Sequence, residues 1–241
     1  MAIGSAMGYL MTIQLFDLAC ANQRIFFSPY CWRIRMSLKH KGIPFESLPW
    51  HFSEKDRIEA SGSTRVPVIL DQGRAIAESW DIADYLDKAY PEAPPLMAGT
   101  AARARAKFIE SWCNATVFPT MRAIAVPSVF EIIADKDKAY FRESREKMLG
   151  SKLEELSKDP AAETAAMNKA LKPAADALTE ADFLAGTSPD YADYVLFGTI
   201  MWPYVVCREN PLDMSSPIGE WFERMLNLHD GFARGAARAH G

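Results

Sequence analysis

Ser28 and Pro29 are the first pair of residues whose types and order point to chemistry. Serine is a favoured N-cap and proline fits the first helical position, so the pair predicts the start of a helix. The unpaired N–H groups at such a helix end favour an anion. Ser28 therefore either caps the helix only, or also donates a hydrogen bond to a bound anion.

A thiolate suits such a site, because its pKa falls next to hydrogen-bond donors and a helix N-terminus. A free cysteine thiol titrates near pH ~8.5, and lowering its pKa by about two units takes about 2.7 kcal/mol. Ser28 acts here as a donor and not as a nucleophile. Cys31 lies three residues into the helix, and we interpret it as a packed thiol.

Two further stretches carry polar or special side chains. Arg65 precedes Val66-Pro67, which lies between a polar turn and an apolar run that is typical of a buried strand. Glu78-Ser79 opens the helix expected over residues 79–90. Taken alone, Ser79 is a helix cap and Arg65 a solvated loop charge.

The order of expected elements gives the fold class. Residues 12–18 predict a strand, 29–41 a helix, 44–50 an edge strand because of its prolines, and 66–70 and 74–76 a hairpin. Three prolines within residues 91–95 mark a linker. After it the pattern is helical, over residues 101–125 with a kink near Pro119, 135–156, 161–181 with an interruption at Pro173, 190–209 and 218–230.

We therefore predict an α/β domain over residues 11–90, a linker over 91–99 and an all-helical domain over 100–241. Residues 1–10 lack the basic start of a signal peptide, and we expect a tail outside the fold. Asp190 and Asp193 have the spacing of a capping box at a helix start, which is a folding signal.

Composition narrows the function classes. The 241 residues are 49 % apolar and 24 % charged, with a net charge of -4, so we expect neither a nucleic-acid nor a membrane partner. No apolar run is long enough for a transmembrane helix. The four cysteines and four histidines show no metal-ligand spacing, which predicts no metal site and a reducing cytoplasmic location.

Together these motifs resemble the glutathione S-transferase family, with its thioredoxin-like N-terminal domain and helical C-terminal domain. The resemblance covers nearly the whole chain from residue 11. It implies glutathione as co-substrate. Ser28 is then the catalytic residue, whose hydroxyl donates a hydrogen bond to the glutathione thiolate. It also implies a cis bond before Pro67, so that the Val66 main chain pairs with the peptide part of glutathione. Glu78 and Ser79 then hold its γ-glutamyl group, and Arg65 meets its glycyl carboxylate.

Within the family, the stretches Ser-Pro-Tyr-x-Trp-Arg from residue 28 and Arg-Val-Pro-Val-Ile from residue 65 look like the bacterial lignin β-etherase type and its fungal relatives. The resemblance implies attack of the glutathione thiolate on a hydrophobic aromatic electrophile, and specifically cleavage of a β-aryl ether. It also implies a homodimer. The residues expected to line the acceptor pocket are Phe26, Phe27, Trp112, Asn114, Phe118, Met121 and Trp202, although core packing is an alternative role for each residue of the helical domain.

Two other functions remain open from the sequence. A glutathione-dependent ligand-binding protein keeps the same first site but lacks turnover. A general conjugating or peroxide-reducing transferase keeps Ser28 and accepts varied electrophiles. Disulfide reduction is disfavoured, because Ser28 occupies the position of the attacking cysteine in the similar Cys-Pro-Tyr-Cys turn of glutaredoxins.

Overall fold

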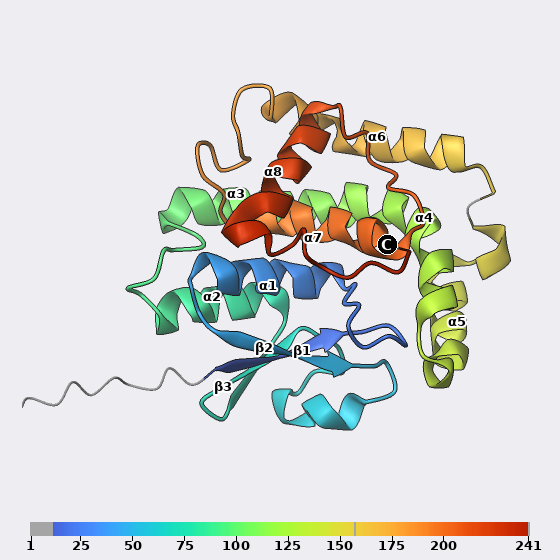
Figure 1. Ribbon diagram of the computed structural model, residues 1–241, viewed down its shortest axis with the longest axis horizontal. Coiled ribbons are helices and arrows are strands. Elements are labelled where there is room, and N and C mark those ends of the chain that lie inside the picture. The colour runs from blue at the N-terminus through green and yellow to red at the C-terminus, as the bar shows by residue number, and fades with distance from the viewer. Residues whose placement is uncertain (1–11, 157, 241) are drawn as a thin grey trace, which may run out of the picture.

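The computed structural model describes residues 12–156 and 158–240. The tail predicted at residues 1–10 lies outside the described residues. The chain forms a small sheet-and-helix unit followed by a helical unit, and Figure 1 shows the sheet at one side of the molecule with successive layers of helices above it. The predicted fold class is confirmed.

The sheet has the strand order β2-β1-β3-β4. β1 (Ile13–Leu18) pairs in parallel with β2 (Phe45–Trp50), and antiparallel with β3 (Val68–Asp71), which forms a hairpin with β4 (Arg74–Ala77). β2 lies at an edge, where a proline within the strand is tolerated. The parallel pair is connected through α1 (Pro29–His40), so the start of α1 follows the end of β1.

Two helices of the first unit lie between the sheet and the helical unit. Figure 1 shows α1 and α2 (Ser79–Ala89) on the face of the sheet that is turned toward α3 and α7. Most of the side chains of α1 are buried, because the helix packs on the sheet and on α7 at once. The 3-10 helix η1 (Lys55–Ser61) connects β2 to β3.

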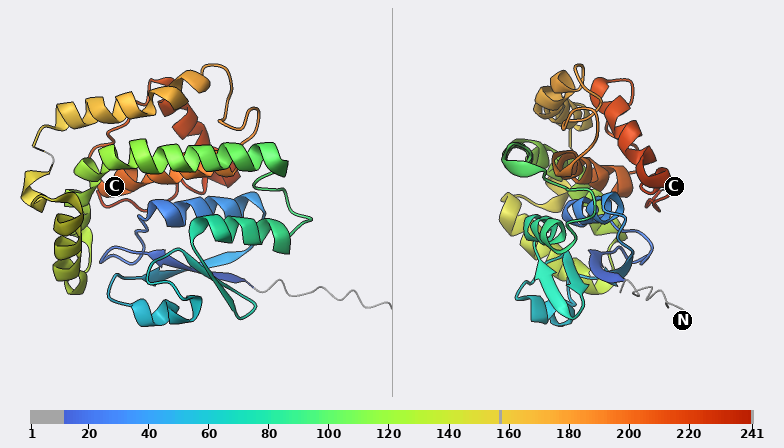
Figure 2. Two further views of the ribbon diagram at one scale, coloured as in Figure 1. Left: turned by 180° about the vertical axis from the view of Figure 1, so that it is seen from behind. Right: turned by 90° about the vertical axis from the view of Figure 1, so that its left-hand side faces the viewer.

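The helical unit begins with α3 (Gly99–Trp112), the π-helical turn η2 (Cys113–Val117) and α4 (Phe118–Ile132). It continues with α5 (Asp135–Leu149), the short η3 (Leu153–Glu155), α6 (Pro160–Ala177), α7 (Tyr191–Val206) and α8 (Pro217–Gly231). Figure 2 shows α6 and α8 as the outermost layer, and α5 running down one flank toward the sheet. None of the helices within the described residues is long and apolar enough to span a bilayer.

Three features of the helices differ from those expected: one end, one interruption and one kink. The helix predicted to reach residue 156 ends at Leu149, because Gly150 adopts a positive φ of 70° and stops it. Pro173 does not interrupt α6, whose buried face (Met167, Ala170, Leu171 and Ala174) holds the helix together across it. At the kink expected near Pro119, the chain forms a π-helical turn that ends at Val117, two residues before that proline.

α7 is the central helix, and every residue in it except Tyr204 is buried. The predicted capping box is present: the Asp190 side chain accepts a hydrogen bond from the Ala192 N–H, and Asp193 accepts one from the Asp190 N–H. Gly198 lets α1 approach α7 closely, because a Cβ there would lie 2.3 Å from the Pro29 carbonyl oxygen. The start of α1 is therefore seated directly on α7.

Candidate active site

Ser28 is the N-cap of α1, with its backbone in the extended region. Its Oγ accepts a hydrogen bond from the Cys31 N–H at 3.3 Å, and the residue is only 3 % exposed. Because the oxygen accepts this bond, the hydroxyl keeps its hydrogen to donate, either to the neighbouring Cys31 thiol or to a ligand. The local geometry thus satisfies both the capping role and the donor role considered for Ser28.

The thiol below Ser28 is inert. Cys31 is completely buried, and burial raises the pKa of its thiol well above the ordinary value, with the nearby Asp17 carboxyl adding to the shift. Burial raises the pKa of Asp17 to about 6, although Arg35 opposes this. Cys31 is a packed thiol, as predicted. Any thiolate that forms at this helix end comes from a ligand.

Ser28 opens into a cavity of about 290 Å³, which we call the apolar cavity. Its lining is mostly aromatic and aliphatic and comes from both units. The lining residues are Leu18, Phe27, Ser28, Pro29, Tyr30, Trp50, Phe52, Thr64, Arg65, Val66, Phe118, Arg122, Val126, Val129, Tyr140, Phe141, Arg145, Met148 and Trp202. The structure thus brings Ser28, Arg65, Val66, Phe27, Phe118 and Trp202 together, as the sequence predicted.

The peptide bond between Val66 and Pro67 is cis, as the resemblance implies. Val66 borders the apolar cavity and precedes β3, which begins at Val68. Within the described residues, the N–H and C=O of Val66 have no hydrogen-bond partner. An extended peptide can therefore pair with this main chain in the manner of strand addition.

A second, polar cavity of about 510 Å³ adjoins the first and shares Thr64 and Arg65 with it. Its other lining residues are Ser61, Gly62, Ser63, Arg74, Ala75, Ile76, Ala77, Glu78 and Asp81. The two cavities together suit a ligand with a charged peptide-like part and a part that enters an apolar space. Among the described residues, no three His, Cys, Asp or Glu side chains gather as a metal ligand set.

Glu78 and Ser79 lie at the start of α2, next to the polar cavity. The helix starts at Ser79, so the capping role considered for Ser79 is wrong: the N-cap residue is Glu78, and its side chain makes no capping hydrogen bond. Glu78 has a φ of 66°, which is strained for this residue type and is typical of functional sites. The first N–H groups of α2 therefore have no side-chain cap and are suited to a carboxylate.

Four residues that the sequence predicted for the acceptor pocket lie outside the lining of the apolar cavity. Met121 is fully buried in the core. Asn114 accepts a hydrogen bond from the Tyr30 hydroxyl at 3.5 Å, and the Phe26 ring packs under the Arg35 guanidinium. Trp112 is half-buried against the core. Arg33, one turn after Ser28, forms a buried ion pair with Glu110.

Sequence analysis missed the lining residues of α4 and α5 other than Phe118. On α4, Phe118, Arg122, Val126 and Val129 recur at the spacing of a single helix face, and Arg145 and Met148 follow Phe141 by one and two turns on α5. This periodicity was available in the sequence. It does not tell which helix face borders a cavity, because that depends on how the helices pack.

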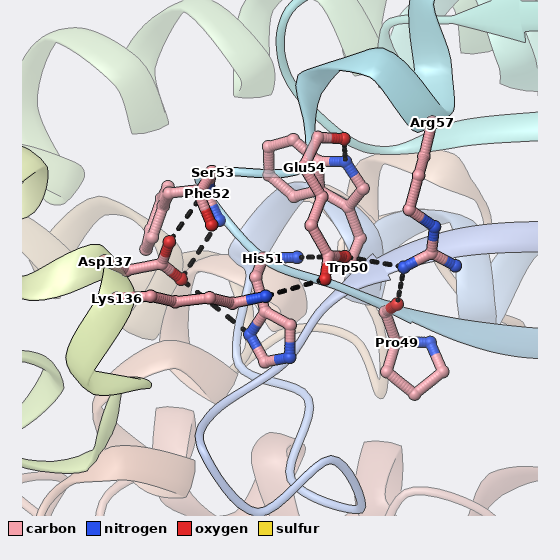
Figure 3. A network of polar contacts seen from close by, with 9 residues as sticks. All are labelled: Pro49, Trp50, His51, Phe52, Ser53, Glu54, Arg57, Lys136 and Asp137. Atoms are coloured by element: carbon pink, nitrogen blue, oxygen red, sulfur yellow. Dashed lines mark hydrogen bonds and ion pairs between the residues drawn. The ribbon is translucent and has the colours of Figure 1, made fainter.

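A buried polar network fixes α5 against the first unit (Figure 3). Asp137, at the start of α5, accepts hydrogen bonds from the Phe52 N–H at 3.2 Å and the Ser53 N–H at 2.9 Å. It also pairs with His51 at 3.8 Å, and Lys136 reaches Glu54 at 2.8 Å. These contacts hold the loop after β2 to α5, so that Phe52 and the residues of α5 face the same cavity.

Two family models match the chain. The one described as "Glutathione S-transferase, N-terminal domain" matches residues 27–89, and the one described as "Glutathione S-transferase, C-terminal domain" matches residues 104–231. Among solved structures, that of CsGST83044 from Ceriporiopsis subvermispora, in complex with glutathione, is 23 % identical, covers 92 % of this chain and 99 % of its own, and has a TM-score of 0.81. That of GSTFuA3 from Phanerochaete chrysosporium is 24 % identical with a TM-score of 0.74, covering 93 % and 94 %. These structural likenesses show the fold.

Curated relatives match more locally. Glutathione transferase GST 23 of Zea mays is 32 % identical over 104 residues, which is 40 % of this chain and 47 % of the maize protein. The glutathione S-transferase-like protein ustS of Aspergillus flavus is 26 % identical over 200 residues, or 71 % and 72 % of the two chains. The chain spans between 40 % and 60 % of the length of three plant relatives that it matches.

Proposed function

The chain belongs to the glutathione S-transferase family, and from that premise we propose that it ionises the thiol of glutathione at Ser28 and transfers the sulfur to a hydrophobic aromatic electrophile. The observation that carries the proposal is the position of Ser28. Its hydroxyl lies at the N-terminus of α1 and borders an otherwise mostly apolar cavity. A thiolate there is stabilised by the hydroxyl and by the helix end, while the surrounding aromatic side chains exclude water.

Glutathione itself takes the polar cavity and the space beside Ser28. The free main chain of Val66 pairs with its cysteinyl residue, and Arg65 meets its glycyl carboxylate where the two cavities join. The γ-glutamyl group lies at the start of α2, where uncapped N–H groups receive its carboxylate and Glu78 its ammonium. Ser79 is 5 % exposed and is the first residue of α2, so its part is to offer its own backbone N–H group to this carboxylate.

The acceptor occupies the apolar cavity between Phe118 and Trp202, whose rings stack with centroids 4.9 Å apart, and the loop residues Phe27 and Phe52. For a β-aryl ether, the thiolate attacks the carbon next to an aryl ketone. The S–C bond forms, the C–O bond breaks, and the phenolate leaves with the electron pair. The proton lost when the thiol ionises goes to solvent and balances the later protonation of the phenolate.

Titration of bound glutathione tests the thiolate step. The ultraviolet absorption of the thiolate is followed against pH for the wild type and for Ser28→Ala. We expect the bound thiol to ionise about two units below its free pKa, and Ser28→Ala to raise that value. If glutathione binds with an unshifted thiol in the wild type, the transferase mechanism is wrong and a glutathione-dependent ligand-binding role replaces it.

The products distinguish the finer proposals. Release of a phenol from a model β-aryl ether, with formation of the thioether, supports the β-etherase activity. Conjugation or peroxide reduction without phenol release identifies a general transferase. A homodimer and a cytoplasmic location are also proposed from the family resemblance alone, and light scattering after size-exclusion chromatography tests the homodimer.

A further inference from the structure

Two arginines of the helical unit border the apolar cavity. Arg122 comes from α4 and Arg145 from α5, and both border the cavity into which Ser28 opens. No Asp or Glu side chain of the described residues lines this cavity. A mostly aromatic cavity thus receives positive charge from two separate helices, and its lining supplies no compensating negative charge.

Both guanidinium groups lack a carboxylate partner among the described residues. The Arg122 Cζ lies 5.0 Å from the centre of the Phe118 ring, and its buried Nε has no hydrogen-bond partner. Arg145 donates to the Ser144 hydroxyl and lies over the Phe141 ring at 4.6 Å. Arg142, one turn earlier on α5, instead bonds Glu146 and Glu154.

The electrostatics of the pair favour an anion. Burial lowers the pKa of Arg145, and repulsion by Arg122 contributes, while Tyr140 opposes the shift. Arginine nevertheless stays protonated at any physiological pH. Arg122 and Arg145 are half-buried, and two neighbouring cations in a mostly apolar lining are costly without a counter-charge. Tyr30, Tyr140 and Arg65 are the other titratable groups of this lining.

We propose that Arg122 and Arg145 form an anion subsite, so that the acceptor of this protein is an aromatic compound that carries a carboxylate. This deepens the proposed function and rests on it. Planar guanidinium groups bind carboxylates through two parallel hydrogen bonds, and the neighbouring rings of Phe118 and Phe141 stack on an aromatic body. The subsite holds the carboxylate end of the acceptor, and this orients the acceptor relative to the glutathione sulfur at Ser28.

The test compares 2-naphthoate with 2-naphthamide, which have the same rings and differ in charge. Binding is measured by calorimetry, with S-methylglutathione present to occupy the glutathione site. The wild type is expected to bind the carboxylate about tenfold more tightly than the amide. Arg122→Met and Arg145→Met each remove most of this preference and leave the affinity for the amide nearly unchanged, whereas Arg145→Lys retains part of it.

Arg142→Met is the matched control, because it removes an arginine from the same helix outside the cavity, and it should keep the full preference. Equal binding of naphthoate and naphthamide by the wild type overturns the inference, as does a preference that survives in both cavity variants. Loss of naphthoate binding when S-methylglutathione is added also overturns it, because the anion then occupies the glutathione site. Thermal melting of each variant separates loss of the subsite from loss of the fold.

The thiol titration of the same proteins keeps this inference apart from the proposed function. If the pKa of the bound glutathione thiol is lowered and the two probes bind equally, the transferase mechanism stands and the anion subsite is wrong. If that pKa is unchanged but naphthoate still binds more tightly than naphthamide, the transferase mechanism is wrong. The two arginines then belong to a binding site for aromatic anions.

Discussion

The two sides of the apolar cavity are built in different ways. The side from the first unit, which we call the thiol side (Ser28, Thr64, Arg65 and Val66), offers two hydroxyls, one guanidinium, a helix end and unpaired main chain. The side from the helical unit, which we call the acceptor side (Phe118, Arg122, Tyr140, Arg145 and Trp202), offers large side chains from three helices. The thiol side combines backbone groups with the side chains of Ser28 and Arg65, whereas the acceptor side consists of side chains alone.

This difference separates the two proposed tasks of the site, which are binding glutathione and selecting the acceptor. Main-chain groups and a helix N-terminus are kept by any sequence that keeps the fold, so the thiol side suits a ligand that does not vary. Side chains on α4 and α5 can change without disturbing the helices that carry them. We therefore expect the acceptor side to determine specificity, and substitutions on the two sides to have separable effects.

The largest expected effect is that of Ser28→Ala, which breaks the thiol side. Loss of the one donor is expected to lower the turnover rate about 100-fold at neutral pH. Because the bound thiol then ionises at a higher pH, the rate should rise toward its maximum about two units later in the pH profile. Steady-state rates with an excess of acceptor, measured across the pH range, check this.

Ser28→Thr is the control for this prediction, since it keeps a hydroxyl and a favoured cap. A pH profile of Ser28→Ala that matches the wild type would show that the hydroxyl does not stabilise the thiolate. Melting temperatures exclude simple loss of the cap, which costs about 1 kcal/mol.

The second prediction concerns the contact that joins the two sides. In Gly198→Ala the new Cβ meets the Pro29 carbonyl oxygen at 2.3 Å, so α1 and α7 must separate. We expect a loss of about 2 kcal/mol in the free energy of unfolding and weaker glutathione binding, because the start of α1 moves. Urea denaturation and calorimetry measure the two effects.

Gly235→Ala is the matched glycine, since the nearest atoms to its added Cβ lie at 3.8 Å and 3.9 Å. It should leave both quantities nearly unchanged. If Gly198→Ala behaves like Gly235→Ala, the close approach of α1 to α7 does not position the site.

The thiol side could be predicted from the sequence because its signals are local. Ser28-Pro29 spans two residues, and the N-cap and first helical position that it favours are the ones observed. The cis bond before Pro67 was implied by the family resemblance and not by the local sequence, which favours a trans bond. Among the local signals, Ser79 is the exception. Its role as a cap was wrong because the strained backbone of Glu78 moves the helix boundary by one residue.

The acceptor side could not be predicted in the same way. Phe118 and Met121 are neighbours in one helical segment, yet the first borders the cavity and the second is fully buried in the core. Residues three apart lie on the same side of a helix, so only the packing of α4 decides which of the two reaches the cavity. Arg145 borders the cavity because Asp137 bonds the Ser53 N–H across 84 residues of sequence, and local patterns carry no information about such a contact.

The third prediction tests this distant contact. Asp137→Ala leaves the partly buried hydrogen bonds from the Phe52 and Ser53 N–H groups without their acceptor, which we expect to cost about 1.5 kcal/mol of unfolding free energy. Acceptor binding should weaken as α5 loosens, while the affinity for glutathione stays the same. The neighbouring Lys136→Met removes only the exposed pair with Glu54 and should cost less than about 0.5 kcal/mol. Equal losses of glutathione and acceptor binding in Asp137→Ala would show that α5 supports both sides of the cavity.

The smallest expected effect is on the pH dependence of the free energy of unfolding, and it compares the cores of the two units. Each core buries one carboxyl group whose pKa is raised to about 6. These groups are Asp17 in the first unit and Asp193 in the second. Burial is the main cause in both. Since the folded pKa lies above the unfolded value of about 3.9, each group adds stability below that value and loses it as the pH rises through the folded pKa. Each should therefore lower the free energy of unfolding by about 1 kcal/mol between about pH 5 and about pH 6.

Asp17→Asn cannot ionise and is expected to remove about half of this decline, which urea denaturation at the two pH values measures. The exposed Asp135, whose pKa is lowered by its hydrogen bond to Lys138, is already ionised in both states above about pH 5. Asp135→Asn should therefore keep the full decline. If Asp17→Asn keeps it as well, the carboxyl beneath α1 is ionised in the folded protein throughout this range, and Asp193 alone accounts for the pH dependence.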